Sequence, residues 1–340
     1  MNITIKKTFM LVFCCFLTLV FCANFSEKKQ AWAAEEKTYN WIVGLSVADN
    51  TVPVLVCRRF GELLSEKSGG RIKLNVYPNG EMGGDIEIGE NVQSGTYNFL
   101  CNMPSNTTIF VPKGAIFDLC GVFSTREQAR TAVDGEFGKL IDKAYQEVGF
   151  KILGWADMGF RMLTSNKEVK QLSDVAGLKV RVIENPHHVA FWKAIGTNPT
   201  PVDWAETYLA LQQGTVNGCE QPYAFIVSNK LYEVQKYIYK TNHLFQFVQL
   251  IMNKKLYDSL SDKDRDIVNQ SAAEASAYGR EVIAQQEIDA EKFLIDYGTK
   301  IVDAPKDLKD KISEVADDYA PTIIGITGEE LFKAYIAPTK

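Results

Sequence analysis

One stretch, residues 177–222, constrains the fold of this chain more than any other, because strand and helix patterns alternate along it. Residues 178–183 (LKVRVI) alternate in polarity as a strand does. Asn185 followed by Pro186 is typical of a helix start, with an N-cap and a proline at the first helical position. Gly196 predicts the end of this helix, where a residue with positive φ is favoured.

The second half of this stretch repeats the pattern. A helix is expected from Asp203 to Gly214, with Glu206 as the capping-box partner of Asp203, and a strand ending at residues 220–222 follows. Because each path between strands contains a whole helix, we expect the strands to be parallel. A ligand then lies beyond their carboxyl ends, and Arg181 lies near one of them.

The amino-terminal part of the chain has the same order of elements. Alternation and turn residues predict strands at 39–47, 71–77 and 97–102, and helices at 54–68 and 85–93. The sequence therefore predicts an α/β protein of two similarly built lobes, a clamp of the periplasmic-binding-protein type that closes on a ligand.

The remaining segments complete this two-lobed architecture. A capping box at residues 124–127 predicts a helix reaching about Glu147, and Ser261 predicts the start of a very long helix to about Tyr297, which we expect to span both lobes. Strands are expected at 150–155, 160–164 and 243–252. The chain is expected to cross between lobes near 157, 245 and 285. The predicted lobes are residues 38–157 plus 246–285, and residues 158–245 plus 286–340.

The amino terminus predicts the compartment. Lys6 and Lys7 precede an apolar run from 9 to 25, and an A-x-A pattern ends at Ala33. We expect a signal peptide over residues 1–33, cleaved near Ala33, and a periplasmic protein. An uncleaved membrane anchor is the alternative, although the run is short for a span. A lipoprotein is disfavoured because Phe21 precedes Cys22. The formal charge of −5 argues against binding to nucleic acid.

Few residues offer metal or catalytic chemistry. The three histidines are too few for most metal sites, His187 and His188 point about 100° apart on a helix, and His243 is expected to have no acidic or cysteine partner nearby. The four cysteines after the signal have no metal spacing; they are expected as buried free thiols, with a Cys101–Cys120 disulfide as the alternative. No nucleophile elbow, phosphate loop or dinucleotide fingerprint occurs. We expect no metal, no cofactor and no catalytic residues.

Two arginines give the more specific signal. Arg161 and Arg181 lie in otherwise apolar predicted strands, where an unpaired guanidinium is costly. Each is satisfied either by an internal carboxylate or by the anion of a ligand. An arginine can hold a planar carboxylate with two parallel hydrogen bonds, which lysine cannot do.

Several blocks in order resemble one known family, the solute receptors of TRAP (tripartite ATP-independent periplasmic) transporters. The most specific are GLKVRV, NPTP, ETYLALQQGTVNG and EQP; YPNGEMGGD, FRMLTSN and LYEVQKYIYKTNH also fit. The resemblance covers nearly the whole chain after the signal. It implies a two-lobed receptor that captures an organic acid and delivers it to a membrane permease driven by an ion gradient.

The resemblance also implies a set of ligand-binding residues. Arg181 corresponds to the arginine that holds the substrate carboxylate, and Arg161 to a second arginine at the cleft. Gln221 stands where the family more often has asparagine, Trp204 replaces a phenylalanine, and Met103 replaces a glutamate of the sialic-acid branch, which puts sialic acid in doubt. The full expected set is Arg181, Arg161, Gln221, Trp204, Met103, Ser46 and Glu184.

The function predicted from this resemblance is a periplasmic receptor, not an enzyme, for a sugar acid or a C4-dicarboxylate. Its partners are the ligand and the permease subunits, and we expect a monomer. One alternative is the receptor of an ATP-driven importer, which usually lacks a single long helix. The other is a secreted enzyme acting on an organic acid with Glu184 or Glu220 as a base.

Overall fold

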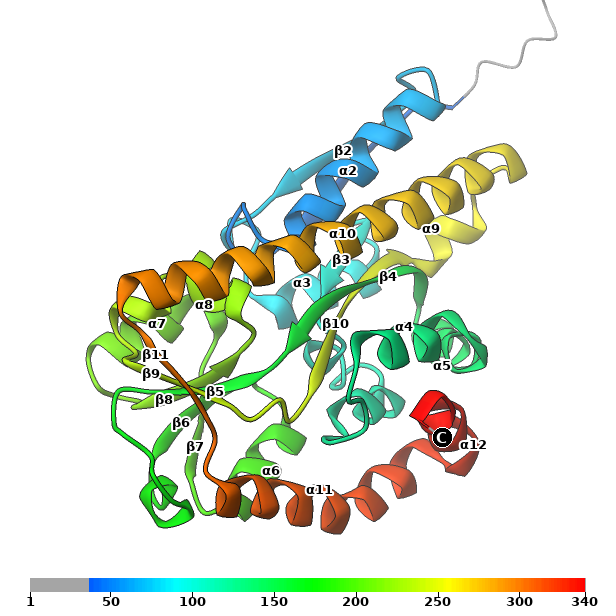
Figure 1. Cartoon of the computed structure of the whole chain (residues 1–340). Helices are drawn as coiled ribbons and strands as arrows, with labels where there is room; N and C mark the ends of the chain where they lie inside the picture. The colour runs from blue at the N-terminus through cyan, green and yellow to red at the C-terminus, as the bar shows by residue number, and fades with distance from the viewer. Residues whose placement is uncertain (1–36, 340) are drawn as a thin grey trace, which may run out of the picture. The chain divides into compact units, whose positions relative to one another are not determined.

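Two β-sheets and the helices around them make up the part of the chain that the structure, a computed structural model, describes, residues 37–339 (Figure 1). The first sheet has the strand order β2-β1-β3-β10-β4. β1 runs parallel to β3, and β10 is antiparallel to both of its neighbours. From Asn40 onward the chain forms one compact unit. The strands are β1 (Tyr39–Gly44), β2 (Ile72–Tyr77), β3 (Phe99–Asn102), β4 (Phe150–Phe160) and β10 (Phe245–Asn253).

The second sheet has the order β11-β9-β5-β8-β6-β7. β6 runs parallel to both β7 and β8, so the predicted parallel arrangement is confirmed. β5 is antiparallel to its two neighbours. The strands are β5 (Met162–Ser165), β6 (Lys179–Val182), β7 (Asn198–Pro201), β8 (Gly218–Gln221), β9 (Tyr237–Lys240) and β11 (Lys300–Asp303).

Helices connect these strands, and several begin and end where the sequence predicts. Asn185 caps α6 by accepting a hydrogen bond from the backbone N–H of His187, and Gly196 ends α6 with a φ of 104°. The helices are α2 (Val52–Lys67), α3 (Asp85–Ser94), α4 (Arg126–Asp134), α5 (Glu136–Glu147), α6 (Pro186–Ile195), α7 (Trp204–Gln212), α8 (Tyr223–Ser228), α9 (Lys254–Asp258), α10 (Asp262–Tyr297), α11 (Lys306–Thr327) and α12 (Glu329–Ile336).

The long helix is confirmed as α10. Ser261 caps it by accepting from the backbone N–H of Asp264, and Gly298 ends it in the left-handed conformation. Its 36 residues correspond to roughly 54 Å at about 1.5 Å per residue. α10 packs against α2 and β4 along one part of its length and against α8 and β11 along another (Figure 1), so it contacts elements of both sheets.

The chain passes between the sheets at two points that lie side by side. β4 ends at Phe160 and β5 begins at Met162, so Arg161 alone separates them. Residues 241–244 connect β9 to β10, and the backbone N–H of Arg161 donates to the carbonyl of Leu244 at 2.9 Å. The exact lobe boundaries stay a prediction.

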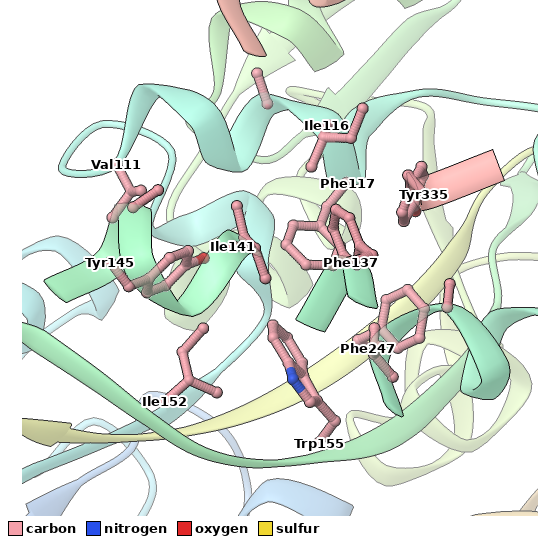
Figure 2. Close-up of a cluster of buried hydrophobic side chains, with 14 of the residues drawn as sticks. Val111, Ile116, Phe117, Phe137, Ile141, Tyr145, Ile152, Trp155, Phe247 and Tyr335 are labelled. Carbon is pink, nitrogen blue, oxygen red and sulfur yellow. The ribbon is translucent and has the colours of Figure 1, made fainter. Parts of the chain in front are cut away.

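Two apolar clusters form the cores. The first, shown in Figure 2, surrounds Phe117, whose ring lies edge-on to those of Phe137, Phe247 and Tyr335, with centroids 5.3, 5.6 and 5.8 Å away. Tyr335 comes from α12, so the carboxyl-terminal helix contributes to the core beside the first sheet. The second cluster lies around β6 and α6 and includes Trp192, which is fully buried.

Three local predictions are wrong. The helix predicted over 124–147 is interrupted at Gly135, whose extended backbone (φ −94°, ψ −150°) ends α4 and starts α5. The capping box there is formed by Thr125 with Gln128 and not by Ser124 with Glu127. At α7, Asp203 is the N-cap as predicted, but it accepts from Ala205, and Glu206 supplies no reciprocal bond.

The four cysteines in the described residues are buried free thiols, so the preferred prediction is confirmed over a Cys101–Cys120 disulfide. The predicted signal peptide, residues 1–33, lies outside the described residues. Among the helices of residues 37–339, none has the length and apolar character needed to cross a bilayer.

Candidate functional site

Six of the seven residues singled out by the sequence lie at or just after the carboxyl ends of parallel strands in the two sheets, and the seventh, Arg161, lies between β4 and β5. Ser46 follows β1 and Met103 follows β3 in the first sheet. In the second sheet Arg181 is the second-last residue of strand β6, Trp204 follows β7, and Gln221 ends β8. Open α/β sheets bind ligands in the crevice outside the carboxyl ends of their strands, which is where these residues lie.

Arg181 is buried, with 3% of its surface exposed, and is held from two sides. Its Nε and Nη2 donate to the backbone carbonyl of Val202 at 2.9 and 2.7 Å. Its Cζ lies 5.3 Å from the ring centroid of Trp204, within cation–π distance. Since a guanidinium has five N–H donors, this leaves three for another partner. Burial lowers the pKa of Arg181, but an arginine stays charged.

No carboxylate forms an ion pair with Arg181 among residues 37–339. Its side chain instead lines a small cavity of about 20 Å³. The cavity wall combines both sheets' elements, with Asp85, Met103 and Asn106 on one side and Arg181, Glu184, Asp203 and Trp204 on the other. The charges of Glu220 and Asp203 act on Arg181 from a distance, but neither carboxylate pairs with it, so its remaining donors can bind an incoming anion.

Arg161 differs from Arg181, because the structure gives it an internal carboxylate. Arg161 and Glu220 are both fully buried; Nε of Arg161 contacts Oε2 of Glu220, and Nη2 donates to Oε1 at 2.7 Å and to the Glu220 carbonyl at 2.6 Å. Nη1 faces Gln246 Oε1 at 3.4 Å and Met103 Sδ at 3.7 Å. Of the two alternatives, an internal carboxylate or a ligand anion, Arg161 therefore has the internal carboxylate. A contact between Arg161 and a ligand stays a prediction.

Gln221 is 1% exposed, yet neither atom of its side-chain amide has a hydrogen-bond partner in the described chain. Asn102 Nδ2 and Asn106 Oδ1 are likewise buried without a partner there. Because unpaired buried amides are costly, such groups indicate that a partner from outside the chain is bound in the working protein. Of these three residues, Asn106 lines the cavity at Arg181, whereas Gln221 and Asn102 end β8 and β3.

The sequence reasoning missed Asp85, an acidic residue on the cavity wall opposite Arg181. Asp85, the first residue of α3, accepts a hydrogen bond from Ser46 Oγ at 2.9 Å. Burial and the charge of Asp203 raise the pKa of Asp85 above its usual value, although the hydrogen bond from Ser46 acts in the opposite direction. Ser46 therefore orients Asp85, while Glu184 is exposed at the cavity rim. The signal for Asp85 was present in YPNGEMGGD, where an acid begins a helix directly after a glycine pair.

A network of buried polar groups joins the two sheets beside this cavity. His188 Nε2 lies 3.1 Å from Asp118 Oδ1, and its Nδ1 lies 3.6 Å from Glu220 Oε1. Burial alone would lower the pKa of His188, but Asp118 and Glu220 raise it to about 9. His243 Nε2 lies 3.2 Å from Glu220 Oε2, so the expectation that His243 has no acidic neighbour is wrong: the fold brings together residues 23 positions apart.

Asn185 and Ser105 extend this network across the sheets. Asn185 Nδ2 donates to the carbonyl of Ser105 at 2.9 Å and to Asp118 Oδ2 at 2.7 Å. Ser105 Oγ donates to Asp118 Oδ1 at 2.6 Å. These hydrogen bonds connect the loop after β3 to the start of α6. They therefore join the two walls of the crevice between the sheets at one of its edges.

The chain is similar to a described family and to curated relatives. Residues 43–323 match the model of the bacterial extracellular solute-binding proteins, family 7. A solute-binding protein of Verminephrobacter eiseniae (strain EF01-2) is 32% identical over 274 residues, which cover 80% of this chain and 81% of the relative.

Two solved structures are similar to this chain in fold over most of their length. The sugar acid-binding protein of Advenella mimigardefordensis strain DPN7T, in complex with galactonate, has a TM-score of 0.85 and 28% identity, covering 89% of this chain and 98% of that one. A TRAP periplasmic solute-binding protein from Polaromonas sp. JS666, bound to D-erythronate, has a TM-score of 0.83 and 29% identity, covering 88% and 99%.

Proposed function

The chain belongs to family 7 of the bacterial extracellular solute-binding proteins, the solute receptors of TRAP transporters, and on that premise we propose that it binds a small organic acid through Arg181. The observation that carries this proposal is the state of Arg181: buried, oriented by Val202 and Trp204, facing a cavity, and without an ion-paired carboxylate among the described residues. The ligand carboxylate would use the Nη1 and Nη2 donors that Val202 leaves available.

The remaining candidate residues have distinct proposed roles. Gln221, whose amide lacks a partner in the described chain, would hydrogen-bond the ligand, and Trp204 and Met103 would form walls. Arg161, paired with Glu220, would shape the site from behind, and Ser46 would act by orienting Asp85. Glu184 would contact the ligand at the rim.

The proposed ligand class is that of the sugar acids and C4-dicarboxylates. The galactonate and erythronate complexes of the similar structures support the sugar acids, and the succinate complex of a similar TRAP solute-binding protein from Sulfurospirillum deleyianum supports the dicarboxylates. We further propose a signal peptide cleaved near Ala33, a periplasmic monomer, and delivery of the ligand to a membrane permease. Metal ligation, a cofactor and binding to nucleic acid form no part of this function.

Replacing Arg181 by lysine should weaken binding by about 1.5–3 kcal/mol, roughly 10- to 150-fold in affinity. The reason is that lysine keeps the charge but cannot donate to the Val202 carbonyl and fork onto a carboxylate at once. The ligand is first found by thermal shift against galactonate, erythronate, glucuronate and succinate, because a ligand at 100 times its dissociation constant adds about 2.7 kcal/mol of stability. Calorimetry with the best of these acids then compares the two proteins.

The matched control for this change is Arg59→Lys, in an exposed pair with Glu62 on α2, which should leave affinity unchanged. Equal affinity of the Arg181→Lys variant and the unmodified protein would remove Arg181 from its proposed role. Mass spectrometry of the recovered ligand separates a receptor, which returns it intact, from the alternative of a secreted enzyme.

Replacing Gly84 by alanine should weaken ligand binding roughly fivefold or more, which corresponds to about 1 kcal/mol of overpacking. A Cβ at Gly84 would lie 2.9 Å from Asp203 Oδ2, across the crevice, and Asp203 is fixed by its bond to Ala205. The added methyl group would therefore oppose closure of the two walls. Gly325→Ala is the control, since a Cβ there meets no atom within 4 Å; calorimetry showing equal affinities for both variants would contradict the prediction.

A further inference from the structure

A second, larger cavity adjoins the one at Arg181. Its volume is about 280 Å³, and its walls come from the loop after β3, the start of α6 and the end of α11. Asn106 and Glu184 line both cavities, so the two are neighbours that meet at these residues. The other residues that matter here are Ile109, Pro112, His187 and Ile326.

The two cavities differ greatly in size. The cavity at Arg181, about 20 Å³, has room for about one water molecule or the oxygen end of a carboxylate, because a bound water needs roughly 10–15 Å³ on the same measure. The rest of any ligand whose carboxylate reaches Arg181 must lie elsewhere. The larger cavity is the neighbouring space, because Asn106 and Glu184 belong to the walls of both cavities.

We propose that this larger cavity is the subsite for the distal part of the ligand, and that the ligand is an organic acid longer than four carbons with a hydroxyl group near its carboxylate. The proposal rests on the proposed function, in which Arg181 holds the carboxylate. It assigns a place to the remainder of the molecule that the Arg181 cavity alone cannot contain.

The chemistry of the walls changes along the cavity. At the junction, Asn106 Oδ1 has no partner in the described chain and Glu184 is exposed, so both can accept a hydrogen bond from a ligand hydroxyl. Farther out, Ile109 and Ile326 are 65% and 40% exposed, and Pro112 lies between their elements. Such apolar surface favours the carbon skeleton of a distal chain.

The polar groups at the floor of the larger cavity are already paired. Asn185 donates to Ser105 and Asp118, Ser105 Oγ donates to Asp118, and His187 Nδ1 lies 3.0 Å from the Tyr319 hydroxyl. These groups have little capacity left for a second carboxylate, and no lysine or arginine lines this cavity. A second acid group at the far end of the ligand would therefore find no cation there.

The test compares acids that differ in length, using two matched pairs: erythronate with galactonate, and lactate with phenyllactate. We expect the longer member of at least one pair to bind about 10-fold more tightly or better, the effect of burying one or two further groups. The polyol and phenyl pairs show which kind of distal chain the subsite takes. Filling the cavity by Ile109→Trp, or from the opposite wall by Ile326→Trp, should abolish this gain and leave the shorter acid's dissociation constant unchanged.

Val302→Trp, at an exposed apolar position on β11, controls for the added indole. The subsite is disproved when neither longer acid gains affinity, or when the gain survives both filled variants. Loss of all binding in Arg181→Lys with no length effect in the unmodified protein would uphold the proposed function and overturn only this inference. Failure of every acid to bind the unmodified protein would instead overturn the proposed function, and the subsite with it.

Discussion

Replacing Glu220 by glutamine should lower the free energy of unfolding by about 3–5 kcal/mol, the largest effect we expect from a single substitution in this chain. Glu220 and Arg161 are both fully buried, and the carboxylate of Glu220 accepts from Arg161 and faces His243. Burial alone would raise the pKa of Glu220, but the Arg161 charge and the bonds to His188, His243 and Arg161 hold it well below its usual range. Glutamine keeps the shape and leaves the guanidinium without a counter-charge. Urea unfolding followed by circular dichroism measures the loss.

An exposed ion pair provides the control for this prediction. Glu62→Gln breaks the surface pair with Arg59 and should cost at most about 1 kcal/mol. Replacing both buried partners, Arg161→Met with Glu220→Leu, should recover part of the loss, because no uncompensated charge then remains. A loss below 1 kcal/mol for Glu220→Gln would show that Arg161 finds another partner or that water reaches it.

The stabilisation provided by His188 should disappear at high pH. Asp118 and Glu220 raise the pKa of His188 to about 9, against about 6.5 in an unfolded chain. A group with a raised folded pKa stabilises the fold fully below its unfolded pKa and loses this contribution as pH rises through the folded pKa. The difference in unfolding free energy between the unmodified protein and His188→Gln should therefore shrink by about 3 kcal/mol between pH 6 and pH 10, at about 1.36 kcal/mol per pKa unit.

Other titrating groups near His188 are present in both proteins of this comparison. Asp118 accepts from His188, Glu220 lies 3.6 Å from it, and Arg161 and His243 lie around Glu220. Burial lowers the pKa of His243, and it lowers that of the neighbouring His187. His187→Gln is thus a matched control whose contribution is lost as pH falls below about 6.5. A His188→Gln difference that stays constant from pH 6 to pH 10 would contradict the assigned ion pair.

Features that depend on neighbours in sequence could be predicted. The caps at Asn185 and Ser261, the end of α6 at Gly196, and the parallel arrangement of β6 with β7 and β8 all follow from local patterns. The strand β10 could also be predicted, because a long apolar run is typical of a strand inside a sheet. All of its residues are buried, and it lies between β3 and β4. Local signals failed at Gly135, where an extended backbone conformation divides an otherwise continuous helical pattern.

Features that depend on distant pairing could not be predicted. Nothing in the sequence shows that Glu220 reaches Arg161, 59 positions away, or that Asp118 reaches His188, 70 positions away. The first pair forms where the chain crosses between the sheets and the second joins the end of a 3-10 helix to α6, so the geometry of both follows from the fold and not from composition. The fork of Arg181 on the Val202 carbonyl belongs to the same class, since it depends on how β6 and β7 end side by side.

The polar network from Ser105 to His188 also limits how the crevice can open. Its hydrogen bonds join the two sheets at one edge, beside the crossings at Arg161 and residues 241–244, whereas at Gly84 and Asp203 the walls merely touch. We therefore expect the two walls of the crevice to separate at Gly84 and Asp203 while the hydrogen-bonded edge at Ser105 stays closed. A solute would then enter from the side of Gly84.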